Sequence, residues 1–351
     1  MFDLEVNTFA VRTAILQAIR SSRSMGCRRT LLGSIGCFIL TVLQSVSFAA
    51  PASRELTRFT FTEYHMGVDA RLVVYAPDQK VAEDACAAAF EKIAALDTIM
   101  SDYRLDSELM RLCDKAGGAP VRVSPDLFKV LRRSREFSER TSGMFDVTVG
   151  PLVRLWRKAR KTGMVPKPSE ILAARRLVGW QKMRLDEQAQ TVRLALPGMK
   201  LDLGAIGKGY ADDEAQAVFR KFGITHALVE MGGDIVVSGP PPGVSGWAIE
   251  VPNAGKSKKT PEMRFTNCAV STSGDTEEFV VIGGTRYSHV IDPHTGQALT
   301  KRVQATVIAK DGLTSDPLST AMTLLDEPGR SRLRKLYPGT KCFVMTLGGG
   351  D

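Results

Sequence analysis

One short stretch constrains the fold of this chain more than any other. Leu201-Asp-Leu-Gly-Ala-Ile-Gly-Lys-Gly-Tyr-Ala-Asp212 begins with alternating apolar residues, continues through three glycines and a lysine, and runs into a helical pattern. We therefore expect a strand over Lys200–Leu203, a glycine-rich bend and a helix over Tyr210–Phe222. Glycines let backbone N–H groups approach a bound anion, and the start of a helix adds unpaired donors and the positive end of its dipole.

The residues of this bend allow two interpretations. Lys208 suits a phosphate, and Asp202 suits a hydroxyl or an amine on the same ligand. The spacing of Gly204, Gly207 and Gly209 matches neither a Walker A loop nor the dinucleotide-binding fingerprint. The bend is therefore either a site for a phosphate-bearing ligand or an ordinary turn between a strand and a helix.

The N-terminal segment has the pattern of an export signal. Arg28 and Arg29 precede the apolar run 31–43, and small residues follow up to Ala50. A basic region, an apolar region too short to span a membrane comfortably and a small-residue cleavage site are typical of a secretory signal peptide. We therefore expect residues 1–50 to be a signal peptide and the mature protein to be exported to the periplasm.

The route of export has alternatives. The arginine pair is compatible with a twin-arginine signal as well as with Sec export. Met25 is an alternative start, because residues 1–24 are long for a basic region and include the acidic Asp3 and Glu5. An inner-membrane lipoprotein anchored through Cys37 is less well supported, since Ser34 stands where an aliphatic residue is expected.

Composition argues against several classes of function. The formal net charge is +9, and aromatic residues make up 7% of the chain without interleaving with the basic runs. This pattern argues against a nucleic-acid-binding protein and favours an anionic ligand. The cysteines of the mature chain and its histidines are scattered, so neither a disulfide framework nor a zinc site is expected.

The order of helices and strands indicates the fold class. About 300 residues remain after the leader, enough for a single domain over residues 51–351 with a substantial core. It begins with a hairpin of Phe59–Tyr64 and Ala70–Tyr75, followed by a long amphipathic helix over Lys80–Met100. A helical middle section comes next, and short strands resume after Trp180. Because helices and mostly antiparallel strands mix without regular βαβ alternation, the expected class is α+β.

A carboxylate and a hydroxyl near the C-terminus have the spacing of a metal site. Asp316 and Thr320 are four residues apart, with an expected helix that begins at Pro317 and is capped by Ser315. A carboxylate and a hydroxyl on one helix face suit a hard cation such as Mg²⁺, which also bridges substrate phosphates. The ordinary polar start of a helix is the alternative, and the commoner one.

Three further segments carry side chains that suit catalysis or binding. His289 lies late in an expected strand and precedes the turn Asp292–Gly296, Tyr103 follows the long helix, and Phe145 and Asp146 precede a new helix. Each has an ordinary structural alternative. A histidine is often only a hydrogen-bonded residue, a tyrosine a packing residue and an aspartate a helix cap.

Taken together, these segments resemble the ApbE-type flavin transferases, the FAD:protein FMN transferases. The resemblance runs in order from about Met66 to about Leu325, nearly all of the mature chain. No single motif is decisive, whereas eight in the same order are highly specific. They are Met66-Gly67, Met100-Ser101 with Tyr103, Phe145–Leu152, Asp202–Ala211, Gly232–Asp234, Ser271–Gly274, Ser288-His289 with Asp292–Gly296, and Ser315-Asp316 with Ser319–Ala321.

The resemblance implies a fold and a set of site residues. The fold would be a duplicated α+β core with a helical lobe and a ligand cleft between two lobes. FAD would be contacted by Met66, Tyr103, Met144, Phe145, Asp146, Asp202 and Lys208. Mg²⁺, or Mn²⁺ in its place, would be held by the Ala205 carbonyl, Asp316 and Thr320. His289 would lie at the reacting centre as the candidate base, with Asp292 as a weaker candidate.

The resemblance also implies a reaction. A Ser or Thr hydroxyl of an acceptor protein would attack the FMN-side phosphorus of FAD, AMP would leave, and FMN would stay attached through a phosphoester. The acceptors would be flavoprotein subunits of membrane-associated or exported redox systems, which implies proximity to the membrane surface.

Three other functions compete with this one. The same site would serve an FAD pyrophosphatase that passes FMN to water. A non-catalytic periplasmic flavin-binding protein would need the pocket but not both Asp316 and Thr320, so their joint presence favours an enzyme. A generic exported α+β binding protein would require the motifs to coincide by chance.

Overall fold

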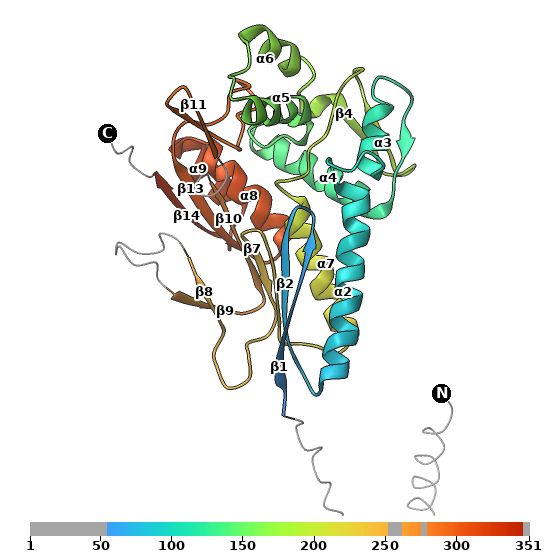
Figure 1. Cartoon of the computed structure of the whole chain (residues 1–351), viewed down its shortest axis with the longest axis vertical. Helices are drawn as coiled ribbons and strands as arrows, with labels where there is room; N and C mark the ends of the chain where they lie inside the picture. Colours follow the sequence, from blue (N-terminus) through green and yellow to red (C-terminus); the bar gives the residue numbers. More distant parts are fainter. Residues whose placement is uncertain (1–54, 252–261, 275–278, 347–351) are drawn as a thin grey trace, which may run out of the picture. The chain divides into compact units, whose positions relative to one another are not determined.

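The computed structural model describes residues 55–251, 262–274 and 279–346, and its centre is a seven-stranded sheet (Figure 1). The strand order is β1-β2-β6-β7-β10-β13-β14, and all neighbouring strands are antiparallel. The strands are β1 Thr57–His65, β2 Val68–Ala76, β6 Ala227–Met231, β7 Asp234–Val237, β10 Cys268–Gly274, β13 Val303–Ala309 and β14 Lys341–Thr346. The expected signal peptide, with Met25 and Cys37, lies outside the described residues.

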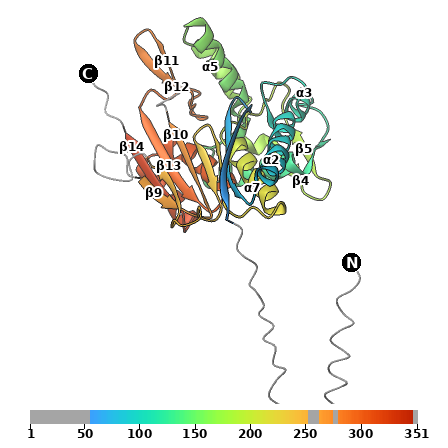
Figure 2. The same cartoon turned by 60° about the horizontal axis from the view of Figure 1, so that its bottom comes forward.

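Three helices cover one face of this sheet. They are α2 (Gln79–Met100), α7 (Gly207–Lys221) and α8 (Gly312–Leu324), and Figure 2 shows α2 and α7 side by side. Alternation along β2 explains the layering, because successive side chains of a strand point to opposite faces. Leu72 and Val74 join the core beneath the helices, whereas Val73 packs on the other face.

A small hairpin covers that second face. It consists of β8 (Trp247–Glu250) and β9 (Glu262–Phe265), which pair with each other. Trp247 and Phe265 pack there with Val73 of the large sheet. The central strands are therefore buried on both faces, which suits the nearly continuous apolar sequences of β6 and β13.

A helical lobe lies between β2 and β6 in the sequence. Its elements are α3 Glu108–Asp114, β3 Val121–Arg122, α4 Pro125–Arg140, α5 Gly150–Thr162, α6 Pro168–Arg175, β4 Met183–Asp186 and β5 Thr191–Leu194, with 3₁₀ turns at Val147–Val149 and Trp180–Lys182. Ser124 caps α4 and Pro125 occupies its first turn, an arrangement that the sequence predicts.

Two further elements pack on these lobes. A hairpin of β11 (Phe279–Ile282) and β12 (Thr285–Ser288) contributes Tyr287 to an apolar cluster with Trp156 of α5. Helix α9 (Glu327–Leu336) is capped by Asp326. No helix among the residues described here is long and apolar enough to cross a membrane.

The α+β class is confirmed, but several element predictions are wrong. The strand expected to contain His289 ends at Ser288, one residue before it. Lys200–Leu203 does not pair as a strand, because the Asp202 N–H donates to the carbonyl of Val147. The helix that follows begins at Gly207, three residues before Tyr210.

Helix α8 also begins earlier than expected, which places Pro317 inside it rather than at its start. The reason is a cap from a distant part of the chain. The Asp213 carboxylate of α7 accepts from the N–H groups of Gly312 and Leu313, each at 2.8 Å. Because these first N–H groups are satisfied, the helix can start a full turn before the proline, which then removes one backbone bond only.

Candidate functional site

The glycine-rich bend meets helix α8 at two glycines. A Cβ atom on Gly209 would collide with the backbone carbonyl of Gly312, and the reverse also holds. Only glycine therefore allows the starts of α7 and α8 to touch. The contact brings the two predicted parts of the site together, because the Gly209 N–H donates to Oδ2 of Asp316 at 3.2 Å.

Lys208 lies in the same place, between the bend and the large sheet. Its Nζ is 2.9 Å from Oδ2 of Asp234 and donates to the carbonyl of Gly204 at 3.2 Å. Asp234 opens β7 directly after Gly232 and Gly233, both with positive φ, so the tight turn aims a buried carboxylate at the lysine. Gly232–Asp234 is one of the eight motifs of the resemblance, but the sequence does not predict this ion pair.

The inner face of α7 continues this polar region into the core. Asp212 and Gln216 follow Lys208 at one-turn intervals and are buried beneath the sheet. The Gln216 amide donates to the carbonyls of Ala227 and Val236 at 3.2 and 2.9 Å. Within the described structure, neither carboxylate oxygen of Asp212 nor Oε1 of Gln216 has a hydrogen-bond partner.

The electrostatics of this region are dominated by buried carboxylates. Burial, followed by the charge of Asp234, raises the pKa of Asp316 to about 7. The same two causes, in the same order, raise the pKa of Asp212 well above its ordinary value. Burial of Lys208 lowers the pKa of its ammonium. The negative charges of Asp234 and Asp316 outweigh this effect, so the pKa of Lys208 is raised. Three buried carboxylates thus share one ammonium, an imbalance that a divalent cation would correct.

The proposed metal ligands have the donor atoms that such a cation requires. Asp316 offers a carboxylate and Thr320 a hydroxyl one helical turn later, and Ala205 lies half-buried in the bend with a backbone carbonyl. Oxygen ligands of these kinds suit Mg²⁺ and Mn²⁺. Among the described residues, no three His, Cys, Asp or Glu side chains gather as a metal site.

A network of hydroxyl groups positions Thr320. Its Oγ1 is 2.9 Å from Oγ of Ser273 on β10, and Ser273 is 2.8 Å from Oγ of Ser319. One turn earlier, Ser271 of β10 is 2.7 Å from Oγ of Ser315. The Ser271–Gly274 motif therefore holds α8 against the sheet and fixes the direction of the Thr320 hydroxyl.

Asp202 belongs to a second cluster that the sequence did not reveal. Arg157 of α5 pairs with Asp202 at 3.1 Å and with Asp102, and its guanidinium lies 4.1 Å from the centre of the Tyr103 ring. Burial, followed by the charge of Asp102, raises the pKa of Asp202, and Arg157 opposes this shift. Oδ1 of Asp202 accepts from the N–H of Gly204 at 2.9 Å, which ties the cluster to the bend.

Tyr103 is the exposed part of this cluster. Its side chain is 73% exposed, and an exposed aromatic ring can stack on a planar ligand. In the sequence, Arg157 could have been identified because it directly follows Trp156, which lies on the buried face of α5. A polar residue at the edge of such a face borders the neighbouring element.

Met66 reaches the bend from the tip of the β1–β2 hairpin. It adopts a positive φ of 50° before Gly67. A Cβ built on Gly207 would lie 3.5 Å from the methyl carbon of Met66, and one on Gly232 would lie 2.8 Å from Val68. The hairpin tip thus touches both the helix start and the turn before Asp234.

The Met144–Asp146 segment lies in the helical lobe. Phe145 is buried edge-on against Phe137, and Met144 is half-buried. The carboxylate of Asp146 accepts from the N–H and hydroxyl of Thr148 at 2.8 and 2.7 Å and from the N–H of Trp180 at 2.8 Å. Asp146 therefore fastens its segment to Trp180, and a role in binding FAD stays a prediction.

The two candidate bases lie on one short hairpin over residues 288–299. His289 is half-buried at its base. Oδ1 of Asp292 accepts from the N–H groups of His294 and Thr295 at 2.7 and 3.2 Å, so this carboxylate closes the turn. At the tip, Nε2 of His294 is 3.1 Å from the carbonyl of Ser142. Catalytic roles for His289 and Asp292 stay predictions.

The chain is similar to known proteins over most of its length. The ApbE family model matches residues 66–344. An FAD:protein FMN transferase of Klebsiella pneumoniae is 32% identical over 305 residues, 85% of this chain and 86% of that protein. One of Escherichia coli K12 is 30% identical over 307 residues, 85% of this chain and 87% of that protein.

The chain is also similar to solved structures of ApbE proteins. The flavin transferase ApbE from Vibrio cholerae superposes with a TM-score of 0.74 at 27% identity, covering 84% of this chain and 95% of that one. The ApbE protein from Thermotoga maritima superposes with a TM-score of 0.75 at 29% identity, covering 84% of this chain and 96% of that one.

Proposed function

The chain belongs to the ApbE family, and from this membership we infer that it is an FAD:protein FMN transferase. It uses FAD and an acceptor protein as substrates and leaves FMN on the acceptor. The observation that carries this conclusion is the contact of Gly209 with Gly312, which joins the lysine of the bend to the carboxylate of α8. A site built from these groups suits a diphosphate, the part of FAD at which the transfer occurs.

In our proposal, the acceptor hydroxyl, on a serine or threonine, attacks the FMN-side phosphorus of FAD. A phosphoester forms, the bond to the AMP phosphate breaks, and the hydroxyl proton goes to a base. Lys208 and the N–H groups of the bend neutralise charge on the phosphoryl oxygens. Asp316, Thr320 and the Ala205 carbonyl would hold Mg²⁺ or Mn²⁺, which supplies further positive charge to the diphosphate.

The flavin nucleotide is proposed to lie in a cleft between the two lobes. Met66 would contact it from the β1–β2 hairpin, Tyr103 would stack on a ring, and Asp202 would accept from a hydroxyl or an amine. The Met144–Asp146 segment would line the same cleft through Met144 and its backbone. The exposed ring of Tyr103 beside the Arg157 pair supports this arrangement.

We propose His289 as the base that takes the proton of the acceptor hydroxyl. A neutral imidazole is suited to this task near neutral pH, and general-base catalysis contributes about 10²–10⁴ in rate. Asp292 is the weaker candidate, because its carboxylate already accepts two backbone hydrogen bonds.

Localisation in the periplasm is likewise a proposal, and it is supported by the signal-like pattern of residues 1–50. Export would proceed by the Sec or the twin-arginine route. The acceptors would then be flavoprotein subunits of membrane-associated or exported redox systems that face the same compartment.

The proposed reaction is tested with the mature protein, FAD, Mg²⁺ and a candidate acceptor domain. We expect the acceptor to gain the mass of FMN and an equal amount of AMP to appear, and the Asp316→Asn variant to produce neither. AMP with free FMN and no gain of mass would instead identify a pyrophosphatase. Bound FAD without products would identify a flavin-binding protein.

A second test concerns the hydroxyl network around Thr320. Ser273→Ala removes the partner of the Thr320 hydroxyl, so we expect Mn²⁺ affinity in the presence of FAD to fall about 10–100-fold. Electron paramagnetic resonance of free Mn²⁺ measures this affinity directly. Ser271→Ala is the matched control, because it removes a similar contact to Ser315 but leaves Thr320 untouched. Equal affinities in the two variants would contradict the role given to Ser273.

A further inference from the structure

A hollow of about 420 Å³ lies where the helical lobe meets the 288–299 hairpin, and neither Lys208 nor Asp316 lines it. Three segments form its walls, the loop that begins at Ser142, the end of α6 with the following turn, and the tip of the 288–299 hairpin. Arg175 and Arg176 line it and are exposed, and His294 reaches it from the hairpin. Of the residues that line it, Asp146 alone belongs to the segment proposed to contact FAD, and neither the arginines nor His294 do.

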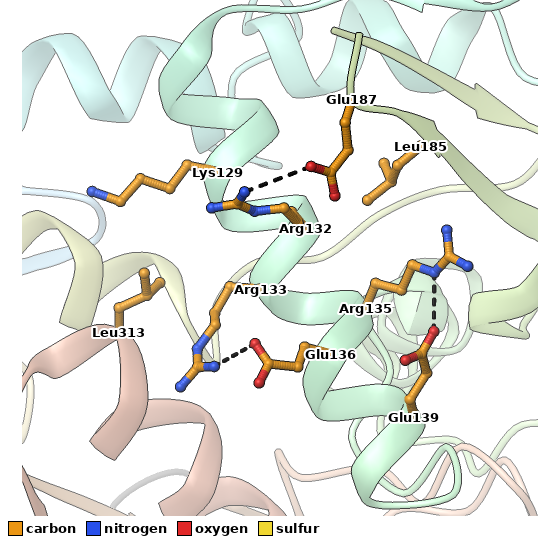
Figure 3. A pocket seen from close by; sticks show the side chains of 9 residues that line it. All are labelled: Lys129, Arg132, Arg133, Arg135, Glu136, Glu139, Leu185, Glu187 and Leu313. Carbon is orange, nitrogen blue, oxygen red and sulfur yellow. Dashed lines mark hydrogen bonds and ion pairs between the residues drawn. The ribbon is translucent and has the colours of Figure 1, made fainter.

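The positive charge of this hollow distinguishes it from a second hollow of the molecule. A larger hollow of about 560 Å³ along α4 also contains several arginines, but there each faces an acidic partner (Figure 3). The pairs in that hollow are Arg132 with Glu187, Arg133 with Glu136 and Arg135 with Glu139. Its cations are therefore already neutralised by the protein.

Arg175 and Arg176 differ in this respect. Within the described part of the chain, neither forms an ion pair. The acid that lines the hollow is Asp146, and its carboxylate is already occupied by Thr148 and Trp180. Two uncompensated guanidinium groups in a concave surface attract a carboxylate or another anion.

The hollow also offers apolar contact. Leu172 is 50% exposed, and the half-buried indole of Trp180 forms part of the wall beside Pro293. Arginine and tryptophan are enriched at surfaces that bind another polypeptide.

The 288–299 hairpin connects this hollow to the proposed base. Ser288 N–H donates to the carbonyl of Leu299, and Asp292 N–H to that of Gln297, so the two sides of the hairpin are paired. His289 lies at its base and His294 at its tip. At about 3.3 Å per residue, an extended segment of roughly five residues would span the hairpin from tip to base.

The tip is also firmly held. The indole N–H of Trp156 donates to the Gly296 carbonyl at 2.9 Å, and a Cβ on Gly296 would lie 2.9 Å from Cδ of Arg175. The arginine stem and the hairpin thus pack against each other, which fixes the position of the hollow relative to His289.

We propose that this hollow, with Arg175 and Arg176, is the docking site for an acidic segment of the acceptor protein. The proposal rests on the proposed function, since it assigns a place to the protein substrate of that reaction. The acceptor is favoured over FAD as the occupant because the Lys208 and Asp316 region already accommodates the diphosphate. The hydroxyl of a segment bound here would approach along the hairpin towards His289.

The test measures peptide binding by fluorescence anisotropy at low salt. The probes are labelled peptides with one central threonine, flanked by four aspartates in one and by four lysines in the other. We expect wild type to bind the acidic peptide at least 10-fold more tightly, and Arg175→Glu with Arg176→Glu to lose this preference. Arg176→Glu alone, which leaves the packed stem of Arg175 intact, should weaken the acidic peptide at least 3-fold.

The matched control is Arg184→Glu with Lys221→Glu, which makes the same change of charge at two exposed positions outside the hollow. It should keep the preference of wild type. Equal binding of the acidic peptide by both double variants, or no binding by wild type, would overturn the proposal. Loss of binding to phosphatidylglycerol vesicles in the Arg175/Arg176 variant, with peptide binding intact, would identify a membrane contact and overturn it as well.

The same samples are titrated with FAD. FAD should bind equally to wild type and to all variants, because neither arginine is placed near the diphosphate. Failure of wild type to bind FAD would contradict the proposed function without affecting the peptide result, so the two failures are distinguishable.

Discussion

Replacing Lys208 with methionine is expected to lower the rate of FMN transfer by a factor of about 10²–10³. The Lys208 ammonium is 2.9 Å from Asp234 and interacts with the charge of Asp316, and its loss removes one preorganised positive charge from the phosphoryl oxygens, which typically costs this much. The measurement is the initial rate of AMP release with saturating FAD and Mg²⁺. A rate within 3-fold of wild type would exclude Lys208 from the reaction.

The same variant should also be less stable, with a characteristic pH dependence. Removing one partner of a buried ion pair leaves its carboxylates uncompensated, which typically costs about 3–5 kcal/mol of unfolding free energy. The raised pKa of Lys208 means that its stabilisation is fully present at all pH values below 10.5, so wild type keeps it between pH 6 and 8.

In the variant, the pKa of Asp316 should rise beyond the value of about 7 that it has beside the lysine. The folded state then holds more protons than the unfolded state, so stability falls as pH rises from 6 to 8. We therefore expect the loss measured by urea unfolding of the metal-free protein to be larger at pH 8 than at pH 6. Lys80→Met, at an exposed pair with Asp84, is the control and should show no such dependence.

Replacing Gly209 with alanine should have the largest effect on the fold. The new methyl group would collide with the Gly312 carbonyl and lie 2.8 Å from Cβ of Asp316, and both belong to a packed helix that cannot yield easily. We expect the free energy of unfolding to fall by about 3 kcal/mol or more. Urea unfolding followed by circular dichroism provides the measurement.

Gly207→Ala is the matched control for this substitution. It lies on the same helix two residues earlier, where the added Cβ would meet its nearest neighbour, Met66, at an ordinary 3.5 Å. It should leave the unfolding midpoint nearly unchanged. If Gly209→Ala unfolds at the same urea concentration as Gly207→Ala, the close crossing of α7 and α8 is not a feature of the folded protein.

Local signals explain which elements could be predicted from the sequence. The cap at Ser124 with Pro125, and the glycine pairs that close the β6–β7 and β11–β12 hairpins, depend on neighbours in the chain, and the structure agrees with them. The start of α8 could not be predicted in this way. Its cap is Asp213, about a hundred residues away, and only the folded structure brings the two together.

The candidate site likewise contains residues that local sequence signals identify and residues that only the folded structure reveals. Lys208, Asp316 and Thr320 carry recognisable chemistry and lie in recognisable motifs, so the sequence was sufficient to single them out. Asp234 and Arg157 acquire importance only through partners far away in the chain. Asp202 was assigned to a strand that does not form, because a short apolar alternation does not reveal that its backbone bonds to Val147.

The polar row on the inner face of α7 has a consequence for the evolution of the protein. Asp212 and Gln216 are buried on the face of α7 that meets the core, and among the described residues three of their oxygens have no hydrogen-bond partner, which costs free energy. Mutations selected only for heat resistance would therefore accumulate first along this face. Lys208 lies at the end of the same row. Substitutions that stabilise this face would therefore be expected to affect catalysis by Lys208 before they affect other parts of the site.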